Sequence, residues 1–435
     1  MNLRWTASAL AVAALLTVVP PAGPQSAASV RVIDAQTRQP LAGAIVTADR
    51  SELRTDAHGL VSLTRLPAGA VRARAYGYGR ADGKAGARPG GTVEIALAPL
   101  RPRALYLTVY GIGSRPLRTG VYDLLDTTEL NALVVDLKGD RGIIPYPSAI
   151  PLAARAGALR VKTIADLSAL AADLHRRGVY AIARIVVFKD SLLATARPDL
   201  AVRRRNGAIY RDREDLAWTD PRSREVWDYN IAVAIEAARA GFDEIQFDYV
   251  RLPDATDLAW PSPWTQAARQ APIEGFLRAA RTALIPYNVF LAADVFGYVC
   301  WNTNDTRIGQ QLEHVTDIVD YVSPMLYPSS FQFGIPGYRN PVQHPREVVQ
   351  LTLERGLART QAPPLRFRPW LQAFRDYAFG GRAFGRAEIR AQIDAAEKVG
   401  TDGWMLWNPQ NRYAGADITT APPQAPRHPR IDLRP

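Results

Sequence analysis

An alternation of short apolar runs with amphipathic segments over residues 104–413 constrains the fold most strongly. Each apolar run has the length of a strand, whereas the segments between them, such as 164–178 and 225–241, have the apolar spacing of a helix. The runs are nearly continuous in apolar residues, which indicates a parallel sheet buried on both faces. Eight runs can be counted, and they begin at Ala104, Asn131, Tyr180, Phe242, Asn288, Asp320, Leu365 and Gly403.

Eight strands that alternate with helices predict a (β/α)8 barrel, which we place at residues 104–416. The alternative is a doubly wound sheet, which usually has a glycine-rich phosphate-binding turn after its first strand. Here the first run leads into GIGSRPLRTG at 111–120, a poor match to GxGxxG. The pattern therefore favours the barrel.

Residues 29–99 have a different pattern. Short alternating segments such as VRVID, AIVTA and VEIALAPL are separated by turn-forming stretches such as TDAHG and LPAG. This is typical of a small antiparallel β-sandwich. The charged, proline-rich end at 417–435 predicts a loosely ordered tail.

The first 28 residues have the pattern of a signal peptide. A positive charge at Arg4 precedes an apolar run at 7–19, and small residues end the segment at Ala27 and Ala28. The run is too short to span a bilayer comfortably, so an uncleaved membrane anchor is the less favoured alternative. We expect a protein exported to the periplasm or beyond, with no membrane span after cleavage at residues 1–28.

The net charge of +11 comes from basic residues that are almost all arginine. Apart from the run at 203–205 they are scattered, and no stretch interleaves them with aromatic residues as a single-strand nucleic-acid groove would. We expect no nucleic-acid partner and interpret the charge as favouring solubility and attraction to anionic polymers. The single cysteine, Cys300, excludes an intrachain disulfide and a CxxC metal site.

In a (β/α)8 barrel the carboxyl ends of all the strands meet at one rim, where the active site of this fold is built. Alternation places Asp136 and Lys138 together on the inward face of the second strand, and Gln246 and Asp248 on that of the fourth. Residues with polar or aromatic side chains gather at the predicted strand ends, and those expected to bind the substrate are Asp136, Lys138, Arg184, Arg251, Tyr327, Trp370, Gln372 and Trp407.

Two rim carboxylates suit glycoside cleavage, which needs a nucleophile or base and an acid that protonates the leaving oxygen. Asp248 and Asp294 come from adjacent strands and are the predicted catalytic pair, with Asp136 as a third candidate. A cation, either Arg184 or Arg251, would keep one carboxylate ionised while the pKa of the other rises. We assign Asp248 as nucleophile because its neighbours are polar and cationic. Asp294 is assigned as acid because apolar residues flank it on both sides.

Other chemistries fit this rim less well. A metal-dependent hydrolase on this fold gathers histidines at strand ends, and all five histidines here fall elsewhere. The sequence has neither a GxSxG elbow nor a Cys–His pair placed to form a nucleophile and base. We therefore expect neither a metal nor a cofactor.

Several motifs occur in order along the predicted barrel, among them VVDLKGDRGIIPY, FDEIQFDYVRLP, AADVFGY, VSPMLYPSSF and GWMLWNP. On these motifs the chain resembles a bacterial family of exported glycoside hydrolases with a (β/α)8 barrel. The resemblance implies that Asp248 in FDYVR and Asp294 in ADVFG are site residues. It also implies a cleft lined by Asp136, Lys138, Arg251, Tyr327 and Gln372.

Two positions depart from the family pattern. Leu252 stands where the family usually has Phe, which is a change between core-like residues. Ser330 and Phe331 stand where a His-Tyr pair is common, so a polar substrate contact is absent here. The N-terminal segment, with GAIVTA, TDAHGLVSL and AYGYG in order, resembles the carboxypeptidase regulatory-like domains, which implies a spacer or docking module at 29–99.

Two functions from different classes remain open. The first is an exported glycosidase that cleaves a polysaccharide or oligosaccharide, and the second is a glycan-binding barrel of the cell envelope without turnover. The paired carboxylates favour the first, because a binding module does not require an acid beside a nucleophile. Adjacent strands favour a short gap between Asp248 and Asp294, and hence a retaining mechanism. The sequence leaves the sugar, the linkage and the oligomeric state open.

Overall fold

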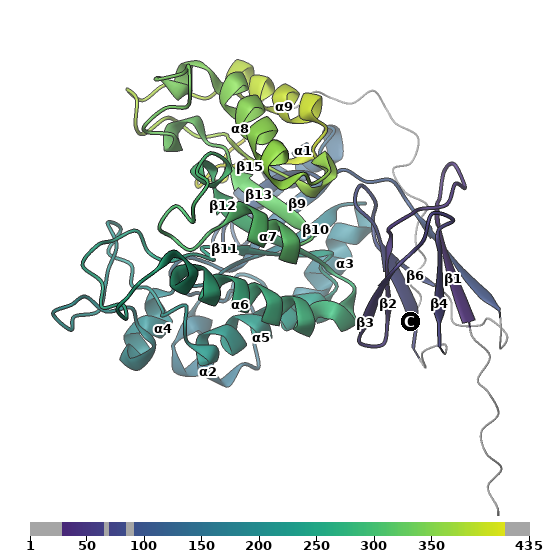
Figure 1. The fold of residues 1–435 in the computed structure, drawn as a ribbon, viewed down its shortest axis with the longest axis horizontal. Helices are drawn as coiled ribbons and strands as arrows, with labels where there is room; N and C mark the ends of the chain where they lie inside the picture. Colours follow the sequence, from purple (N-terminus) through teal and green to yellow (C-terminus); the bar gives the residue numbers. More distant parts are fainter. Residues whose placement is uncertain (1–27, 65–68, 84–90, 414–435) are drawn as a thin grey trace, which may run out of the picture.

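The computed structural model describes residues 28–64, 69–83 and 91–413, which form a barrel and a smaller sandwich (Figure 1). The predicted signal peptide, apart from Ala28, and the predicted tail at 417–435 lie outside these described residues. Both therefore stay predictions.

The predicted (β/α)8 barrel is confirmed. Eight parallel strands close into a ring in sequence order, and the last pairs with the first. Each of the eight apolar runs contains one strand, although β14 is only three residues long. The strands are β8 (Arg103–Leu107), β9 (Ala132–Lys138), β10 (Tyr180–Val186), β11 (Glu244–Asp248), β12 (Phe290–Phe296), β13 (Tyr321–Met325), β14 (Trp370–Gln372) and β15 (Trp404–Trp407).

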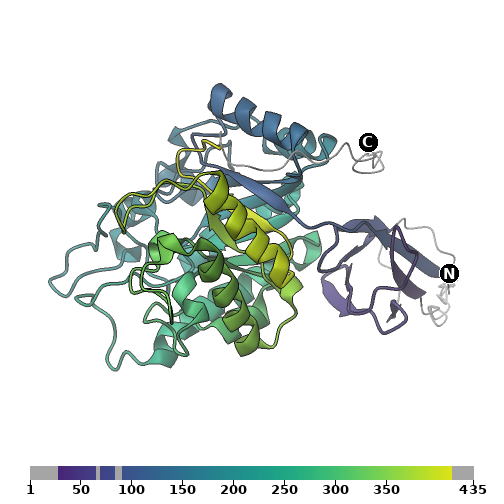
Figure 2. The same cartoon turned by 90° about the horizontal axis from the view of Figure 1, so that it is seen from above.

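Helices connect these strands and surround the barrel (Figure 2). The longer ones have clear ends: the Ser223 side chain caps α5, and Gly241, at φ 108°, ends it. Of the helices in the described residues, none combines the length and apolar character needed to cross a membrane. The helices are α1 (Arg115–Thr127), α2 (Pro151–Arg155), α3 (Leu167–Arg176), α4 (Ser191–Ala196), α5 (Arg224–Ala240), α6 (Gln266–Leu284), α7 (Leu312–Ile318), α8 (Pro345–Thr360) and α9 (Arg386–Val399).

Alternation divides each strand between the barrel interior and the layer beneath the helices. Leu133 and Val135 of β9 belong to the large core under the helices, whereas Val134 belongs to the interior core. The interior is filled mainly by large aromatic side chains, so the barrel is a packed core and not a pore. The aromatic residues of that interior are Tyr106, Tyr180, Phe290, Tyr321 and Trp370.

The N-terminal segment forms two small sheets around an apolar core, as predicted for a sandwich. All strand pairs are antiparallel except β1 and β7, which run parallel. One sheet contains β4 (Leu60–Leu63), β1 (Ala28–Asp34) and β7 (Thr92–Leu97). The other contains β3 (Ser51–Arg54), β2 (Ile45–Ala48), β5 (Val71–Arg74) and β6 (Ala81–Gly83).

The sandwich packs against the end of the barrel at which the strands begin (Figure 1). Arg74 Nη1 donates to Asn288 Oδ1 at 3.1 Å, two residues before β12. Arg80 Nε donates to the Asp243 carboxylate at 2.9 Å, one residue before β11. The described part of the sandwich thus covers the amino ends of the strands, opposite the rim at which an active site is expected.

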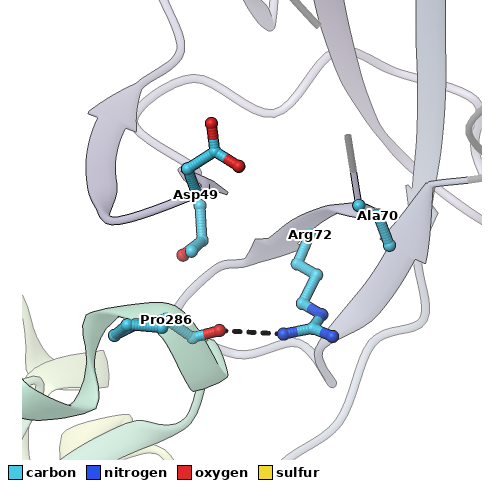
Figure 3. A pocket seen from close by; sticks show the side chains of 6 residues that line it. Asp49, Ala70, Arg72 and Pro286 are labelled. Carbon is cyan, nitrogen blue, oxygen red and sulfur yellow. Dashed lines mark hydrogen bonds between the residues drawn. The ribbon is translucent and has the colours of Figure 1, made fainter. Parts of the chain in front are cut away.

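A small pocket of about 160 Å³ lies at this junction (Figure 3). Arg72 points from β5 toward the barrel and donates from Nη1 to the Pro286 carbonyl at 2.8 Å. The pocket is therefore part of the contact between sandwich and barrel and lies away from the carboxyl ends of the strands. Its lining residues are Thr47, Asp49, Gly69, Ala70, Arg72 and Pro286.

The centre of the junction is a buried ion cluster. Arg74, only 2% exposed, pairs with Glu52 of the sandwich at 2.5 Å and with Asp320 of the barrel at 3.5 Å. Arg281 of α6 pairs with the same two carboxylates at 2.9 and 3.2 Å. Burial opposes the ionised forms, but the two arginines still lower the pKa of Asp320. The two domains are therefore joined by buried arginine and carboxylate groups that compensate one another's charge.

We predict that Arg74→Met lowers the free energy of unfolding by about 3 kcal/mol, because removing one member of a buried ion cluster leaves the others uncompensated. Urea unfolding followed by tryptophan fluorescence measures this change. Arg38→Met is the matched control, since Arg38 pairs with Glu94 on the exposed surface of the same sandwich. Equal shifts in the two variants would contradict the structural role of Arg74.

Candidate active site

Three carboxyl groups surround one guanidinium at the carboxyl ends of β9 to β12. Arg184 of β10 donates from Nη1 to Asp136 Oδ1 of β9 at 2.6 Å. From Nη2 and Nε it donates to Asp248 Oδ2 of β11 at 2.5 and 3.1 Å. Asp294 Oδ2 of β12 lies 3.8 Å from Nε. All four side chains are buried, so the cluster is assembled where charges interact strongly.

The backbone changes direction directly after Asp248. Tyr249 has a φ of 49°, a left-handed conformation that side-chain-bearing residues rarely adopt. Its N–H donates to Asp248 Oδ1 at 2.5 Å. Together with the two Arg184 donors, three N–H groups converge on the Asp248 carboxyl group, an arrangement suited to its charged form. Strained residues of this kind cluster at functional sites, because the surrounding structure must hold them in place.

Asp294 has a different environment. Trp370 Nε1 donates to its Oδ1 at 2.8 Å, but its buried Oδ2 has no hydrogen-bond partner among the described residues. Burial and then the neighbouring charge of Asp248 raise the pKa of Asp294 well above its usual range, and Arg184 opposes this only in part. Burial and the charge of Asp248 therefore favour the protonated form of Asp294.

Asp136 completes the cluster and receives a second donor. Besides the Arg184 guanidinium, the Tyr106 hydroxyl donates to this carboxyl group, at Oδ2 and 2.6 Å. Burial raises the pKa of Asp136 above its usual value, and Arg184 and Tyr106 offset this rise only in part. Within the described ranges, no group of three or more histidine, cysteine, aspartate or glutamate side chains is arranged to hold a metal ion.

The positions around Arg184 also limit the gap between the two predicted catalytic residues. Arg184 Nε is 3.1 Å from Asp248 Oδ2 and 3.8 Å from Asp294 Oδ2, so these two oxygens lie at most about 7 Å apart. Carboxyl groups lie about 5–5.5 Å apart in retaining glycosidases and about 6.5–9.5 Å apart in inverting ones. A maximum of about 7 Å between this one pair of oxygens is compatible with the first class and with the lower end of the second.

Aromatic rings form one wall of the cluster. Trp407 of β15 stacks on Tyr106 with ring centres 4.1 Å apart, and the Arg184 guanidinium lies 4.8 Å from the Trp407 ring. Tyr327, after β13, has a hydroxyl whose pKa is raised well above its usual range by burial and by the charges of Asp294 and Asp248. Tyr327 and Trp407 are both partly exposed, so a ligand at the rim can reach both rings.

The sequence predicted Lys138 on the inward face of β9 beside Asp136, and this prediction is wrong. Arg184 lies opposite Asp136, but the next residue, Ile185, lies opposite Lys138, so Leu137 is an extra residue that interrupts the alternation. Lys138 therefore turns toward α5. There its fully buried ammonium pairs with Asp190 at 2.8 Å and lies over the Tyr229 ring.

Gln372 and Trp370 are also enclosed rather than open to the rim. Gln372 is fully buried, accepts from the Ser329 N–H at 3.0 Å and donates to the Ser329 hydroxyl at 2.7 Å, which fixes the loop after β13. Trp370, 1% exposed, holds Asp294. In this structure both side chains support the site, and their predicted contact with a substrate stays a prediction.

Arg251 lies at the rim but does not pair with Asp248, which Arg184 contacts instead. Its guanidinium lies 5.0 Å from the Trp218 ring and 5.3 Å from the Tyr249 ring.

Tyr106 and Tyr249 were not predicted from the sequence. Alternation within ALYLTVYG already places Tyr106 inward between two outward leucines, whereas no sequence signal marks the left-handed backbone of Tyr249.

Residues 104–413 match the model of a protein family described as "Putative glycosyl hydrolase domain". Among proteins with curated descriptions, none matches the chain. A solved structure of a hypothetical protein from Ruminiclostridium thermocellum ATCC 27405 is 39% identical, with 44% of this chain and 97% of that one covered and a TM-score of 0.40.

Two further solved structures are more distant in sequence. The PgaB (BpsB) glycoside hydrolase domain from Bordetella bronchiseptica is 18% identical over 72% of this chain and 95% of that one, with a TM-score of 0.52. A class V chitinase from Pseudomonas fluorescens Pf-5 is 12% identical over 72% of this chain and 97% of that one, with a TM-score of 0.44. At these identities the likeness to PgaB shows a shared barrel fold.

We predict that Asp294→Asn stabilises the protein at pH 7. Because the folded-state pKa of Asp294 is raised above its unfolded value near 3.8, the folded state is favoured fully below that value and loses stability as the pH rises toward the folded pKa. Removing the ionisable group removes this loss. The gain, on the order of 1–2 kcal/mol, should be larger at pH 7 than at pH 4.

Asp320→Asn is the control, and its expected change in stability at pH 7 has the opposite sign. The pKa of Asp320 is lowered by Arg74 and Arg281, so its contribution is present above 3.8 and is lost as the pH falls. This variant should be less stable than wild type at pH 7. Urea unfolding at both pH values measures both effects, and a loss of stability at pH 7 in Asp294→Asn would disprove the raised pKa.

Proposed function

The chain belongs to the family described as "Putative glycosyl hydrolase domain", whose model spans residues 104–413, and from that premise we propose that it is a glycoside hydrolase acting on a polysaccharide. The observation that carries the proposal is a pair of buried carboxyl groups with contrasting hydrogen-bond partners. Asp294 is kept protonated in an enclosed site, whereas Asp248 is held by Arg184 and a backbone N–H. Glycoside cleavage requires this pairing of an acid with a carboxylate.

In the proposed mechanism Asp294 donates its proton to the glycosidic oxygen as the bond to the sugar breaks. Asp248 attacks the anomeric carbon, which becomes positively charged in the transition state, and forms a covalent glycosyl-enzyme. Asp294, now ionised, then removes a proton from the water that releases the sugar. The product keeps the configuration of the substrate, and a gap of at most about 7 Å between the two carboxyl oxygens is compatible with this retaining course.

Arg184 and Trp370 act as positioning residues in this mechanism. Arg184 fixes Asp248 and compensates part of the negative charge when Asp294 gives up its proton. Trp370 holds Asp294 Oδ1, which leaves Oδ2, the oxygen without a partner among the described residues, as the atom that carries the proton. Tyr327 and Trp407 would receive the apolar face of a sugar ring.

Export is part of the proposal and rests on the amino-acid sequence of residues 1–28 alone. An exported enzyme would meet a cell-surface or secreted glycan. We also propose that the sandwich is a carboxypeptidase regulatory-like domain that acts as a spacer or docking module. Its contacts at the amino ends of the strands would leave the catalytic rim accessible to a long polymer.

We predict that wild-type protein releases reducing ends from one glycan in a panel of bacterial exopolysaccharides and cell-wall glycans. Asp248→Asn and Asp294→Asn should each lower the rate at least about 10³-fold, because each removes one of the two groups that the reaction needs. Asp254→Asn is the matched control, since Asp254 is an exposed aspartate on the loop after β11 and should leave the rate unchanged.

The same glycans should be tested for binding to all four proteins. If no glycan is cleaved, and one binds equally to wild type and the two catalytic variants, the barrel is a glycan-binding module. Cleavage that survives both Asn substitutions would place the catalytic groups elsewhere.

A further inference from the structure

A line of aromatic rings leads from the carboxyl cluster to the surface of the rim. The ring centre of Trp407 lies 4.8 Å from the Arg184 guanidinium and 6.5 Å from the ring centre of Tyr327. The Tyr327 ring meets Phe374 edge-on at 5.5 Å, and Phe374 lies parallel to Tyr377, with ring centres 6.1 Å and ring planes 7° apart. Each ring is therefore the neighbour of the next, from the site outward.

Exposure is greatest at the outer end of this line. Trp407, Tyr327 and Phe374 are each partly exposed. Tyr377, in the loop after β14, is 57% exposed. Of the four large hydrophobic side chains that are exposed among the described residues, Tyr377 is the one joined to Trp407 by successive ring contacts. Apolar surface that continues from the outside of a protein into a site is typical of a ligand-binding groove.

The loop that carries Tyr377 is held by a buried carboxylate. Asp376, only 4% exposed, accepts hydrogen bonds from three backbone N–H groups at 378–381, at 2.8–3.0 Å. It also accepts one from the Ser329 hydroxyl at 2.7 Å, which ties this loop to the loop after β13. Because Asp376 directly precedes Tyr377, the backbone at Tyr377 is fixed before a ligand arrives. Binding there costs little ordering of the loop.

A series of rings of this kind suits a sugar chain that extends beyond the bond to be cleaved. A pyranose ring with equatorial hydroxyls presents C–H groups on its faces, and an aromatic ring packs against such a face. Trp407 and Tyr327 lie beside the carboxyl cluster, so a sugar bound there would be next to the reacting bond. Phe374 and Tyr377 lie farther out and would receive a sugar unit beyond it.

We propose that Phe374 and Tyr377 form an outer sugar-binding subsite, so that the substrate of this barrel is an extended chain of pyranose units with equatorial hydroxyls. The proposal rests on the glycoside hydrolase function proposed above. A disaccharide held at Trp407 and Tyr327 would leave the outer rings open to water. A longer chain would cover them as well and would gain affinity from the apolar area that it buries.

The test compares short and long chains of the same sugar. The probes are the disaccharide and the hexasaccharide of β-1,4-linked glucose and of β-1,4-linked N-acetylglucosamine. Binding is measured for the full-length protein with Asp294→Asn, so that no probe is consumed. The hexasaccharide of one sugar should bind at least about tenfold more tightly than its disaccharide. Equal affinity for the two lengths, or no binding of any probe, would overturn the proposal.

Adding Tyr377→Leu should lower the affinity for that hexasaccharide about tenfold and leave the affinity for the disaccharide unchanged, because the flat ring is lost only at the outer subsite. Tyr377→Phe keeps the ring and should keep both affinities. Tyr122→Leu is the matched control, since it removes a partly exposed tyrosine from α1. An unchanged hexasaccharide affinity in Tyr377→Leu, or an equal loss in Tyr122→Leu, would disprove the outer subsite.

Reducing-end release by the wild-type protein from the same probes separates the two proposals. Length-dependent binding that is lost in Tyr377→Leu, without cleavage by wild type, would support the outer subsite and count against hydrolysis. Cleavage of a disaccharide with the same kcat/KM as its hexasaccharide would support hydrolysis and overturn the outer subsite.

Discussion

The buried guanidinium of Arg184 is the interaction on which the site depends. Among the described residues it is the one cation that pairs with the three buried carboxyl groups, so it compensates for only part of their charge when all are ionised. Charges of the same sign at this spacing in an enclosed site repel one another, which favours the protonated form of one carboxyl group. Asp294 takes that place because its Oδ2 has no donor, whereas Asp136 and Asp248 each receive short hydrogen bonds from Arg184. The charge pattern needed for acid catalysis therefore follows from the packing.

At the opposite end of the barrel, buried charges pair with one another at and near the contact with the sandwich. Arg368 inside the barrel pairs with Glu244 at 2.5 Å and Asp402 at 3.2 Å, and Arg74 and Arg281 pair with Asp320 beneath β13. The sandwich packs directly over this end. Buried arginines shared between carboxylates and the packed sandwich thus lie at the amino ends of the strands, whereas the strained Tyr249 backbone and the unbalanced carboxyl groups lie at the carboxyl ends. This division is the one expected of a barrel that carries its chemistry on one rim.

Much of this arrangement can be predicted from the sequence, because it depends on periodicity. Apolar runs separated by amphipathic segments specify the barrel, and alternation within strands places Asp136, Arg184, Asp248 and Asp294 at one rim. The predicted inward orientation of Lys138 is wrong for a local reason. The extra residue Leu137 forms a bulge that turns Lys138 outward, and a bulge leaves no periodic pattern in the sequence. Gln372 looked like a ligand contact, but whether a polar side chain meets solvent or a neighbouring loop depends on packing across strands. The choice of Arg184 over Arg251 as the partner of Asp248 likewise depends on three-dimensional distance.

The central claim is that Asp294 carries a proton at neutral pH while Asp248 does not. Infrared difference spectra of wild type against Asp294→Asn and against Asp248→Asn, recorded at pH 7, test it directly. The account predicts that the Asp294 difference contains the carbonyl stretch of a protonated carboxyl group. The Asp248 difference should contain only the paired stretches of a carboxylate. Carboxylate bands in both spectra, or a protonated carboxyl in the Asp248 spectrum alone, would contradict the assignment of acid and nucleophile.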